Sequence, residues 1–367
     1  MHVAIFGAGI AGLMSAITLR MRGHSCTLYE RSRLAHDAGM GFILMPEAIA
    51  CMDRLGIQLT GDCSGVPLKR YVCRNSIGEI LYEEAMPPHS RSIRRRDLIC
   101  ALVNAASIRD AINFDAELER LELDEHGHVA TAVLSSGERI TADLFVAADG
   151  AHSRARHNLF PNWPVRHARV LEVVGLVHCA NTTRWAANNL NKFHAAGGGL
   201  AFGILPVDAD HVVWFMQFDS LRFHPPSSRD AGSQEWRDFV QTLAGQWAYP
   251  VAYLPAATES RDMHVWCPLD TDLIPYFHQK NLVLAGDAAH PLSPFTSQGV
   301  SSAIADAEAL ANALPTGNVN GLLLKGLESY SSQRHRQCAP YLSKGRELMR
   351  IFLAPANGKN FMLPLAR

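Results

Sequence analysis

Three glycines close to the start of the chain have the spacing of a loop that binds phosphate groups. Gly7, Gly9 and Gly12 follow an apolar segment with strand character and precede a segment with helical spacing. The first glycine allows a tight turn, the second lets a pyrophosphate approach the backbone, and the third lets the helix pack on the sheet. Glu30 ends the next predicted strand, where a carboxylate can bind ribose hydroxyls. The pattern predicts a dinucleotide site, and the charge of Glu30 disfavours a 2′-phosphate there.

A second motif lies where an apolar segment, residues 142–148, ends in Asp149 and Gly150. The pair predicts a sharp turn between a strand and a helix, and Ser153 and Arg156 follow with the spacing of a helix start. The residues alone leave a structural turn and a functional one equally open.

A third motif begins at Gly286 and Asp287, which end another apolar segment, and continues through an uncharged loop. Asp287 is placed to bind a hydroxyl group of a cofactor. Gly299 is predicted to begin a helix whose N-terminus can face an anion or an electron-rich ring. His290 is a lone histidine beside this loop, and its more frequent role is a structural hydrogen bond.

The segments around these motifs alternate between strand and helix. Strand patterns at 2–6 and 26–30 enclose a helix at 13–22, which is the beginning of a Rossmann-type sheet. Further helices are predicted at 46–55, 95–106, 233–245 and 298–313. Further strands are predicted at 113–123, 129–134, 140–147, 170–178, 199–205, 211–218 and 282–284.

The pattern changes between about 165 and 264, where strand-like runs are separated by Pro, Gly, Ser and Asn. This favours an antiparallel sheet inserted into the first domain. We therefore expect an α/β fold in which a Rossmann-type dinucleotide-binding domain carries an inserted antiparallel β-sheet substrate domain and C-terminal helices. The expected boundaries are 1–164 and 266–367 for the two parts of the first domain and 165–265 for the substrate domain.

Composition excludes several classes of protein. The chain has 34 Lys and Arg against 35 Asp and Glu, a net charge of -1, which argues against nucleic acid as a main partner. None of its eight cysteines forms a C-x-x-C pair, so we expect no metal site and reduced thiols in the cytoplasm. No apolar run approaches the ~20 residues of a membrane span, and no signal peptide is expected.

The three motifs together resemble those of the aromatic-hydroxylase class of FAD-dependent monooxygenases, which includes p-hydroxybenzoate hydroxylase, salicylate hydroxylase and kynurenine monooxygenase. The likeness extends from residue 2 to about residue 340, and the order and spacing of the motifs are more specific than any single one. It implies FAD as cofactor and NADPH or NADH as co-substrate. Three positions depart from the usual pattern: Ala148 and Ser297 replace glycines, and Ser301 replaces an asparagine.

The resemblance also implies roles for individual residues. It places the three glycines of the first motif and Arg95 at the FAD phosphates, the pair at 30–31 at the ribose, and the backbone of residue 118 at the adenine. It places the third motif at the ribityl chain and the flavin ring. The cofactor-binding residues that it implies are Gly7, Gly9, Gly12, Glu30, Arg31, Arg95, Leu118, Asp149, Gly150, Asp287, Gln298, Gly299 and Val300.

The implied reaction is oxygen-dependent hydroxylation or epoxidation of a small, aromatic or otherwise electron-rich molecule through a flavin C4a-hydroperoxide. Pocket candidates are Pro294, Phe295, His290 and Trp214, although packing in the core is the more frequent role of a residue such as Trp214. Two other functions remain open. One is a flavin oxidase or dehydrogenase on the same scaffold, and the other is a non-catalytic protein that holds FAD. The sequence identifies neither the substrate nor the oligomeric state.

Overall fold

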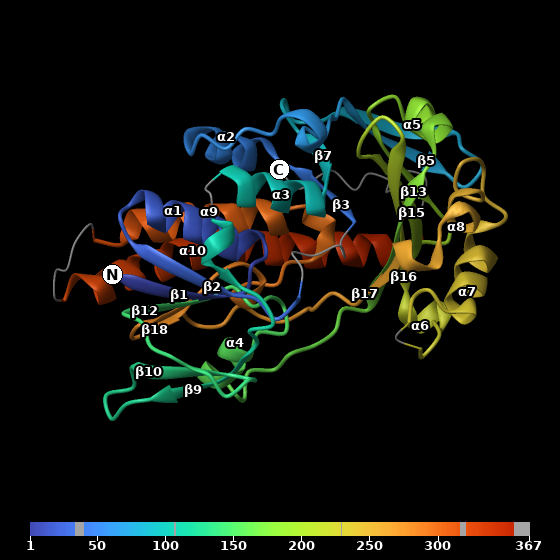
Figure 1. Ribbon diagram of the computed structural model, residues 1–367. Coiled ribbons are helices and arrows are strands. Elements are labelled where there is room, and N and C mark those ends of the chain that lie inside the picture. Colours follow the sequence, from blue (N-terminus) through green and yellow to red (C-terminus); the bar gives the residue numbers. More distant parts are fainter. Residues whose placement is uncertain (34–39, 106–107, 229, 316–320, 356–367) are drawn as a thin grey trace.

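A six-stranded sheet forms the centre of the first unit of the computed structural model, which describes residues 1–33, 40–105, 108–228, 230–315 and 321–355. The strand order is β18–β19–β12–β1–β2–β8 (Figure 1). Five strands are parallel, and β18 joins antiparallel at the edge. The strands are β1 (His2–Phe6), β2 (Ser25–Tyr29), β8 (Ile112–Asn113), β12 (Leu144–Ala147), β18 (His278–Gln279) and β19 (Leu282–Leu284). This is the expected Rossmann-type arrangement.

Strands β1, β12 and β19 are neighbours and end level with one another. Phe6 pairs with Ala147, and Ala147 pairs with Leu284. The carboxyl ends of parallel strands lie at one edge of a sheet. The loops that follow these strands, which carry the three motifs, therefore leave the sheet side by side.

Helices cover one face of this sheet, and a small sheet covers the other (Figure 1). The helical layer contains α1 (Ile10–Met21), α9 (Gly299–Ala313) and α10 (Leu322–Leu353), with α2 (Pro46–Arg54) and α3 (Arg95–Ala105) beside them. Helices α1 and α9 are in direct contact, since the Thr18 hydroxyl donates to the Ala307 carbonyl at 3.0 Å. The small sheet has the order β11–β10–β9 and contains β9 (Leu118–Leu123), β10 (Val129–Leu134) and β11 (Arg139–Ile140).

The predicted strand at 113–123 is interrupted in the structure. Its first residues belong to β8 in the central sheet, whereas Leu118 begins β9 in the small sheet. Between them, the amide of Ala116 donates to the carbonyl of Glu30 at 2.8 Å. This hydrogen bond turns the chain away from the central sheet, and local sequence patterns carry no signal for it.

A second, seven-stranded sheet has the order β17–β13–β16–β15–β14–β5–β6. Its neighbours are antiparallel except for β14 and β5, which are parallel. The strands are β5 (Arg70–Asn75), β6 (Ile80–Ala85), β13 (Val170–His178), β14 (Leu190–His194), β15 (Leu200–Pro206), β16 (His211–Asp219) and β17 (Met263–Trp266). The sheet thus includes two strands from the range 1–164, and the domain boundaries at 164 and 265 stay predictions.

The remaining elements are short apart from one helix. A three-stranded sheet, β3–β7–β4, lies between the larger units and contains β3 (Gly41–Leu44), β4 (Val66–Pro67) and β7 (Arg91–Arg94). The other elements are α4 (Arg154–Leu159), α5 (Ala180–Ala186), α6 (Ser220–Phe223), α7 (Gln234–Ala244), α8 (Leu254–Ala257), and the 3-10 turns Gly61–Cys63, Arg109–Ala111, Ser260–Asp262, Gly286–Ala288 and Pro294–Thr296.

The two faces of β16 pack against different parts of the molecule. Trp214 is buried in a core that includes Trp236 and Val240 of α7, and its indole N–H donates to the Thr258 hydroxyl at 2.8 Å. This is the core packing that is the more frequent role of such a residue, and a contact of Trp214 with the substrate stays a prediction. Strand alternation groups Trp214 correctly with Met216 and Phe218, but it does not say which face of the sheet is covered by helix.

Helix α10 connects the two large sheets. Gly345 packs closely against the loop before α9, because a Cβ at Gly345 would lie 3.0 Å from the Cβ of Ser293. At the end of the helix, the carbonyl of Phe352 accepts a hydrogen bond from the amide of Gly199 at 2.7 Å. The helix therefore contacts both the loop of the third motif and the turn between β14 and β15.

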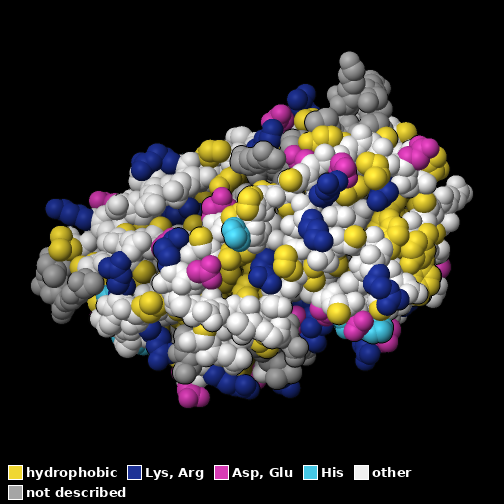
Figure 2. All heavy atoms as spheres, turned by 90° about the horizontal axis from the view of Figure 1, so that it is seen from above, with side chains coloured by type: hydrophobic (Ala, Val, Ile, Leu, Met, Phe, Trp, Pro, Cys, Tyr) yellow, Lys and Arg dark blue, Asp and Glu magenta, His cyan; other side chains and the backbone are white. Residues whose placement is uncertain are grey.

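The surface seen from above carries charges of both signs (Figure 2). Basic side chains lie in separate small groups on this face, and apolar side chains gather toward the end formed by the seven-stranded sheet. None of the helices in the described ranges combines the length and apolar character needed to cross a membrane. The same residues contain no group of three or more His, Cys, Asp or Glu side chains that could hold a metal ion.

Candidate cofactor and active site

The loop after β1 leaves no room for side chains at two of its glycines. Gly7 has φ +99°, and a Cβ there would lie 2.3 Å from the carbonyl oxygen of Ala148. A Cβ at Gly12 would lie 1.9 Å from the carbonyl oxygen of Gly7. Gly9 caps α1, and the nearest atom to a Cβ there is Nη2 of Arg95 at 3.7 Å. Gly7 and Gly12 are thus required by the protein itself, whereas the space at Gly9 is available to a ligand.

Glu30 is buried beside this loop with its carboxylate fixed by backbone amides. Its two oxygens accept hydrogen bonds from the amides of Ala8 at 2.8 Å and Ser32 at 2.9 Å. Arg31 is exposed next to it, and Leu118 is buried at the start of β9. The Glu30 carboxylate is therefore oriented toward the start of α1, as a ribose-binding group requires.

Arg95 brings a positive charge between the first and third motifs. Burial lowers the pKa of its guanidinium, and the carboxylates of Asp287 and Glu30 act in the opposite direction. Its Nε is buried and has no hydrogen-bond partner among the described residues. A buried guanidinium with an unused donor beside a helix N-terminus is suited to a pyrophosphate, which accepts several charge-assisted hydrogen bonds.

Asp149 of the second motif caps the helix that follows it. One carboxylate oxygen accepts from the amides of Arg154 at 2.8 Å and Ala155 at 3.2 Å, and burial raises the pKa of this carboxyl group. Its other oxygen has no partner among the described residues. Gly150 has φ +85°, as the sharp turn requires. These hydrogen bonds give the Asp149 side chain a structural role even without a bound cofactor.

Arg156 joins the second motif to the third. Its guanidinium donates to the carbonyl oxygens of Asp287 at 3.0 Å and Ala288 at 2.9 Å, and also to that of Ala151. The arginine is almost completely buried. These hydrogen bonds fix the backbone of the Gly286–Ala288 turn and do not involve the Asp287 carboxyl group.

The carboxyl group of Asp287 lies among the residues that would surround a cofactor. The side chain is exposed to solvent, yet the surrounding protein raises the pKa of its carboxyl group. His290, Arg95 and Arg156 oppose this increase through their positive charges. Asp287 is thus open to solvent and close enough to Arg95 for the two charges to interact.

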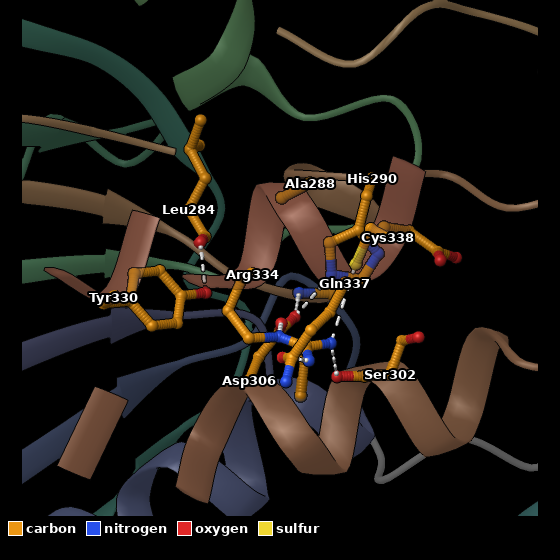
Figure 3. A network of polar contacts seen from close by, with 12 residues as sticks. Leu284, Ala288, His290, Ser302, Asp306, Tyr330, Arg334, Gln337 and Cys338 are labelled. Atoms are coloured by element: carbon orange, nitrogen blue, oxygen red, sulfur yellow. Dashed lines mark hydrogen bonds and ion pairs between the residues drawn. The ribbon is translucent and has the colours of Figure 1, made fainter. Parts of the chain in front are cut away.

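A buried carboxylate, Asp306 on α9, holds the backbone of the third motif (Figure 3). Its Oδ2 accepts from the Gly286 amide at 2.6 Å and lies 2.7 Å from Nε2 of His290. Its Oδ1 accepts from Nε of Arg334 at 2.5 Å. Both cations lower the pKa of Asp306 against the effect of burial. Burial alone would lower the pKa of His290, but the carboxylate raises it well above its ordinary value.

This network assigns His290 a structural role, although it was also predicted as a pocket candidate. The ring is completely buried and lies against Phe277 and Asp306. Arg334, from α10, also donates to the Ser302 carbonyl at 3.1 Å. Arg334 lies on a helix without a recognisable motif, so no local pattern predicts its contact with Asp306.

The loop before α9 adopts a backbone shape that favours glycine. Ser297 has φ +53°, at a position where the monooxygenases that the sequence resembles have glycine. Gln298 is buried and caps α9, while a Cβ at Gly299 would meet nothing within 4 Å. In the first turn, the hydroxyls of Ser301 and Ser302 are buried without a partner among the described residues. Open space and unused polar groups thus meet at the helix N-terminus.

These observations fit a cofactor with phosphates at one end and a polar ring at the other. The unused Arg95 donor and the space at Gly9 suit the phosphates. The helix N-terminus at Gly299 and Val300 suits the polar edge of a flavin, because its free N–H groups attract electron-rich atoms. Pro294 and Phe295 form the turn just before this helix.

Comparisons with known proteins agree with the geometry of the site. The family model described as an FAD binding domain matches residues 1–342. The chain is 28% identical to an FAD-dependent urate hydroxylase of Mycolicibacterium vanbaalenii over 95% of this chain and 87% of that protein. It is 27% identical to the 3-amino-4-hydroxybenzoate 2-monooxygenase PtnB3 of Streptomyces platensis over 92% and 85% of the two chains.

A solved structure with the same fold contains the cofactor. Klebsiella pneumoniae HpxO, solved with FAD and uric acid, superposes with a TM-score of 0.82 at 24% identity. The superposition covers 99% of this chain and 90% of that chain.

Substitutions at Gly9 and Gly12 separate binding from folding. We expect Gly9→Val to reduce FAD affinity at least tenfold while the apoprotein unfolds at nearly the wild-type urea concentration, because only ligand space is filled. Gly12→Val is the matched control and should destabilise the apoprotein by about 1–3 kcal/mol or more, because its Cβ meets backbone. Fluorescence titration with FAD and urea denaturation measure the two effects. Wild-type FAD affinity in Gly9→Val would contradict the phosphate site.

The Asp306 network predicts the pH dependence of stability. The pKa of His290 is raised on folding, so its contribution is complete below its ordinary value of 6.5 and is lost as the pH rises through the folded value. We expect the unfolding free energy to decrease above about pH 6.5, and His290→Gln to remove this part of the slope.

Asp306→Asn should lower the free energy of unfolding by about 3–5 kcal/mol, because the Arg334 charge stays buried without its partner. Urea denaturation between pH 6 and 9 tests both; equal slopes for wild type and His290→Gln would refute the assignment.

Proposed function

The chain belongs to the family of FAD-dependent aromatic hydroxylases, whose model is described as an FAD binding domain. We propose that it hydroxylates a small, electron-rich ring compound with NAD(P)H and O2. The observation that carries the proposal is the position of Arg95, which lies beside Gly9, interacts with Glu30 and Asp287, and keeps an unused buried donor near the N-terminus of α1.

Bound FAD supplies the redox chemistry, in which NAD(P)H provides two electrons and one oxygen atom of O2 enters the substrate while the other leaves as water. The protein supplies position and charge. Arg95 and the N-terminus of α1 balance the pyrophosphate, and Glu30 orients the ribose. Asp287 binds the sugar-alcohol chain between the phosphates and the ring system.

The N-terminus of α9 faces the flavin in this proposal. Residues Gln298 to Val300 present backbone N–H groups that stabilise negative charge on the ring edge. Pro294 and Phe295 form the adjoining wall and exclude water from the substrate. Asp306 and Arg156 act through the backbone of the third motif, so both are positioning residues.

The substrate site that we propose lies where the Pro294–Thr296 turn meets the face of the seven-stranded sheet opposite Trp214. Phe215 and Gln217 of β16 are on this face by strand alternation. Relatives act on urate and on 3-amino-4-hydroxybenzoate, and we propose a nitrogen-containing or hydroxylated aromatic ring of similar size. A cytoplasmic location and transient docking of NADPH or NADH are parts of the same proposal.

Oxygen labelling tests this function directly. The purified protein, loaded with FAD, is mixed with NADH or NADPH, ¹⁸O2 and either urate or 3-amino-4-hydroxybenzoate. We expect a ring compound of this class to accelerate NAD(P)H oxidation at least tenfold and to gain one ¹⁸O atom, as detected by mass spectrometry. Gly9→Val, which should hold FAD at least tenfold more weakly, is the control and should show both effects reduced at limiting FAD.

Other outcomes would support other functions. Hydrogen peroxide formed without labelled product, with a ring compound bound, would favour the oxidase or dehydrogenase. FAD that binds but is reduced by neither nicotinamide would favour the non-catalytic holding protein. Failure to bind FAD would refute all three.

A further inference from the structure

A buried lysine lies on the sheet face that looks toward the flavin-binding loop. Lys192 is on β14, and its side chain is almost completely buried, with 8% of its surface exposed. Its Nζ is 5.5 Å from the ring centroid of Phe295, which belongs to the Pro294–Thr296 turn. The lysine therefore stands between the seven-stranded sheet and the third motif. Neither the sequence motifs nor the cofactor site assigns it a role.

The strand register explains how this side chain reaches across the sheet. Lys192 pairs with Gly203 on β15, and Gly203 pairs with Phe215 on β16. A Cβ at Gly203 would lie 1.9 Å from the Phe215 ring, so only glycine leaves space for that ring. The small residue Ala201, two positions earlier on β15, pairs with Gln217. Lys192 crosses these two small residues to meet Gln217.

Lys192, Gln217 and Glu172 form a row of hydrogen bonds across three strands. Nζ of Lys192 donates to Oε1 of Gln217 at 2.6 Å, and Nε2 of Gln217 donates to the Glu172 carboxylate. The amide is thereby fixed in one orientation, since each of its ends has a partner. It separates the two charged groups, so the lysine is balanced by a carboxylate that it does not touch.

The ammonium group keeps donors that the described residues leave unused. An ammonium has three N–H bonds, and Gln217 is its one recorded hydrogen-bond acceptor in the described ranges. The aromatic rings of Phe215 and Phe352 lie 5.8 and 5.9 Å from Nζ, in addition to Phe295. Rings stabilise a cation through their faces but do not replace a negative charge. An anion that reaches Nζ would meet these donors.

Lys192 and Glu172 can each change protonation state near neutral pH. Burial lowers the pKa of Lys192 to about 8 and raises the pKa of Glu172 to about 7. The other titratable neighbours are Cys73 on β5, whose pKa burial raises to about 11, and His194 on β14, whose pKa is lowered by burial and by Lys192. Both of these are uncharged at neutral pH. Taking up one proton at Glu172 therefore costs little and gives the row a net positive charge.

We propose that Lys192 binds the ring substrate in its anionic form and that Glu172 takes up one proton when the anion arrives. This inference rests on the proposed function and specifies its substrate class as ring compounds with an acidic hydroxyl, ring N–H or carboxyl group. When such a compound enters as a neutral acid, its O–H or N–H bond breaks, the electron pair stays on the substrate, and the proton forms the O–H bond of Glu172. When it enters as an anion, the proton comes from solvent.

The physical reason is charge balance in a low-dielectric site. An anion next to the neutral row would give the buried site a net negative charge, which is costly to bury. With a proton on Glu172, the substrate anion and the Lys192 ammonium form a neutral pair. An anionic ring is also more electron-rich than the neutral ring, as transfer of an electrophilic oxygen atom requires.

Benzoate and benzamide are matched probes for this site, because they share a ring and differ in charge. With FAD-loaded protein at pH 7.5, isothermal titration calorimetry should show benzoate binding at least tenfold more tightly than benzamide. Lys192→Met should remove this preference, and Lys192→Arg should retain it. Measurements in two buffers of different ionisation enthalpy should give uptake of roughly half to one proton per benzoate, and Glu172→Gln should reduce this to near zero.

Each other result decides against the inference. Equal binding of the two probes, binding of neither, or a benzoate preference that survives in Lys192→Met would refute the anion site. Proton uptake that persists in Glu172→Gln would refute the role of Glu172. Thermal unfolding of each variant shows whether it is folded, and Lys192→Arg provides the folded control. If these tests fail while a ring compound still gains ¹⁸O, the proposed function stands and only the anionic substrate class is wrong.

Discussion

The level endings of β1, β12 and β19 are the constraint on which the rest of the site depends. Three parallel strands that end together place their three loops side by side, because neighbouring strands of a sheet lie only a few ångströms apart. The loops can share that space because Gly7 and Gly12 have no side chains, and because the carbonyl of Ala148 occupies the position that a Cβ at Gly7 would need. The cofactor site is therefore a result of backbone packing first and of side-chain chemistry second.

Two buried charged residues hold this backbone arrangement in place through hydrogen bonds. Arg156 holds the turn after β19 from the side of the second motif, and Asp306 holds it from the side of α9. Asp306 is stabilised in turn by two cations, so the network carries more positive than negative charge around one carboxylate. That imbalance favours electron-rich groups nearby, and the N-terminus of α9 acts in the same direction.

The local parts of this site could be predicted from the sequence because they depend on short spacings. The turn at Gly7, the helix of α1 and the breaks at Asp149 and Gly286 each follow from residues within one segment, and the structure confirms these elements. The helix bounds at α2, α3, α7 and α9 differ from prediction by one residue at most at each end.

The non-local parts could not be predicted from the sequence. That Arg95 lies beside Gly9 followed only from the family resemblance, and no pattern connects Arg334 to Asp306. The sequence left open whether Trp214 faces the core or the pocket, because alternation relates residues to one another but not to the core. The row of Lys192, Gln217 and Glu172 draws on three strands, with small residues on a fourth making the space. It is visible only when the register is known.

The length of α10 has a consequence for motion in this molecule. A helix of 32 residues is about 48 Å long and behaves as a stiff rod. One part of it packs on the loop before α9, and its end is hydrogen-bonded to the turn between β14 and β15. Any rotation of one large sheet relative to the other must therefore bend this rod or detach its end. Pro340 lies within the helix and cannot donate a backbone hydrogen bond, so bending is easiest there. The stretch between Pro340 and Phe352 thus ties the loop that carries Phe295 to the turn between β14 and β15.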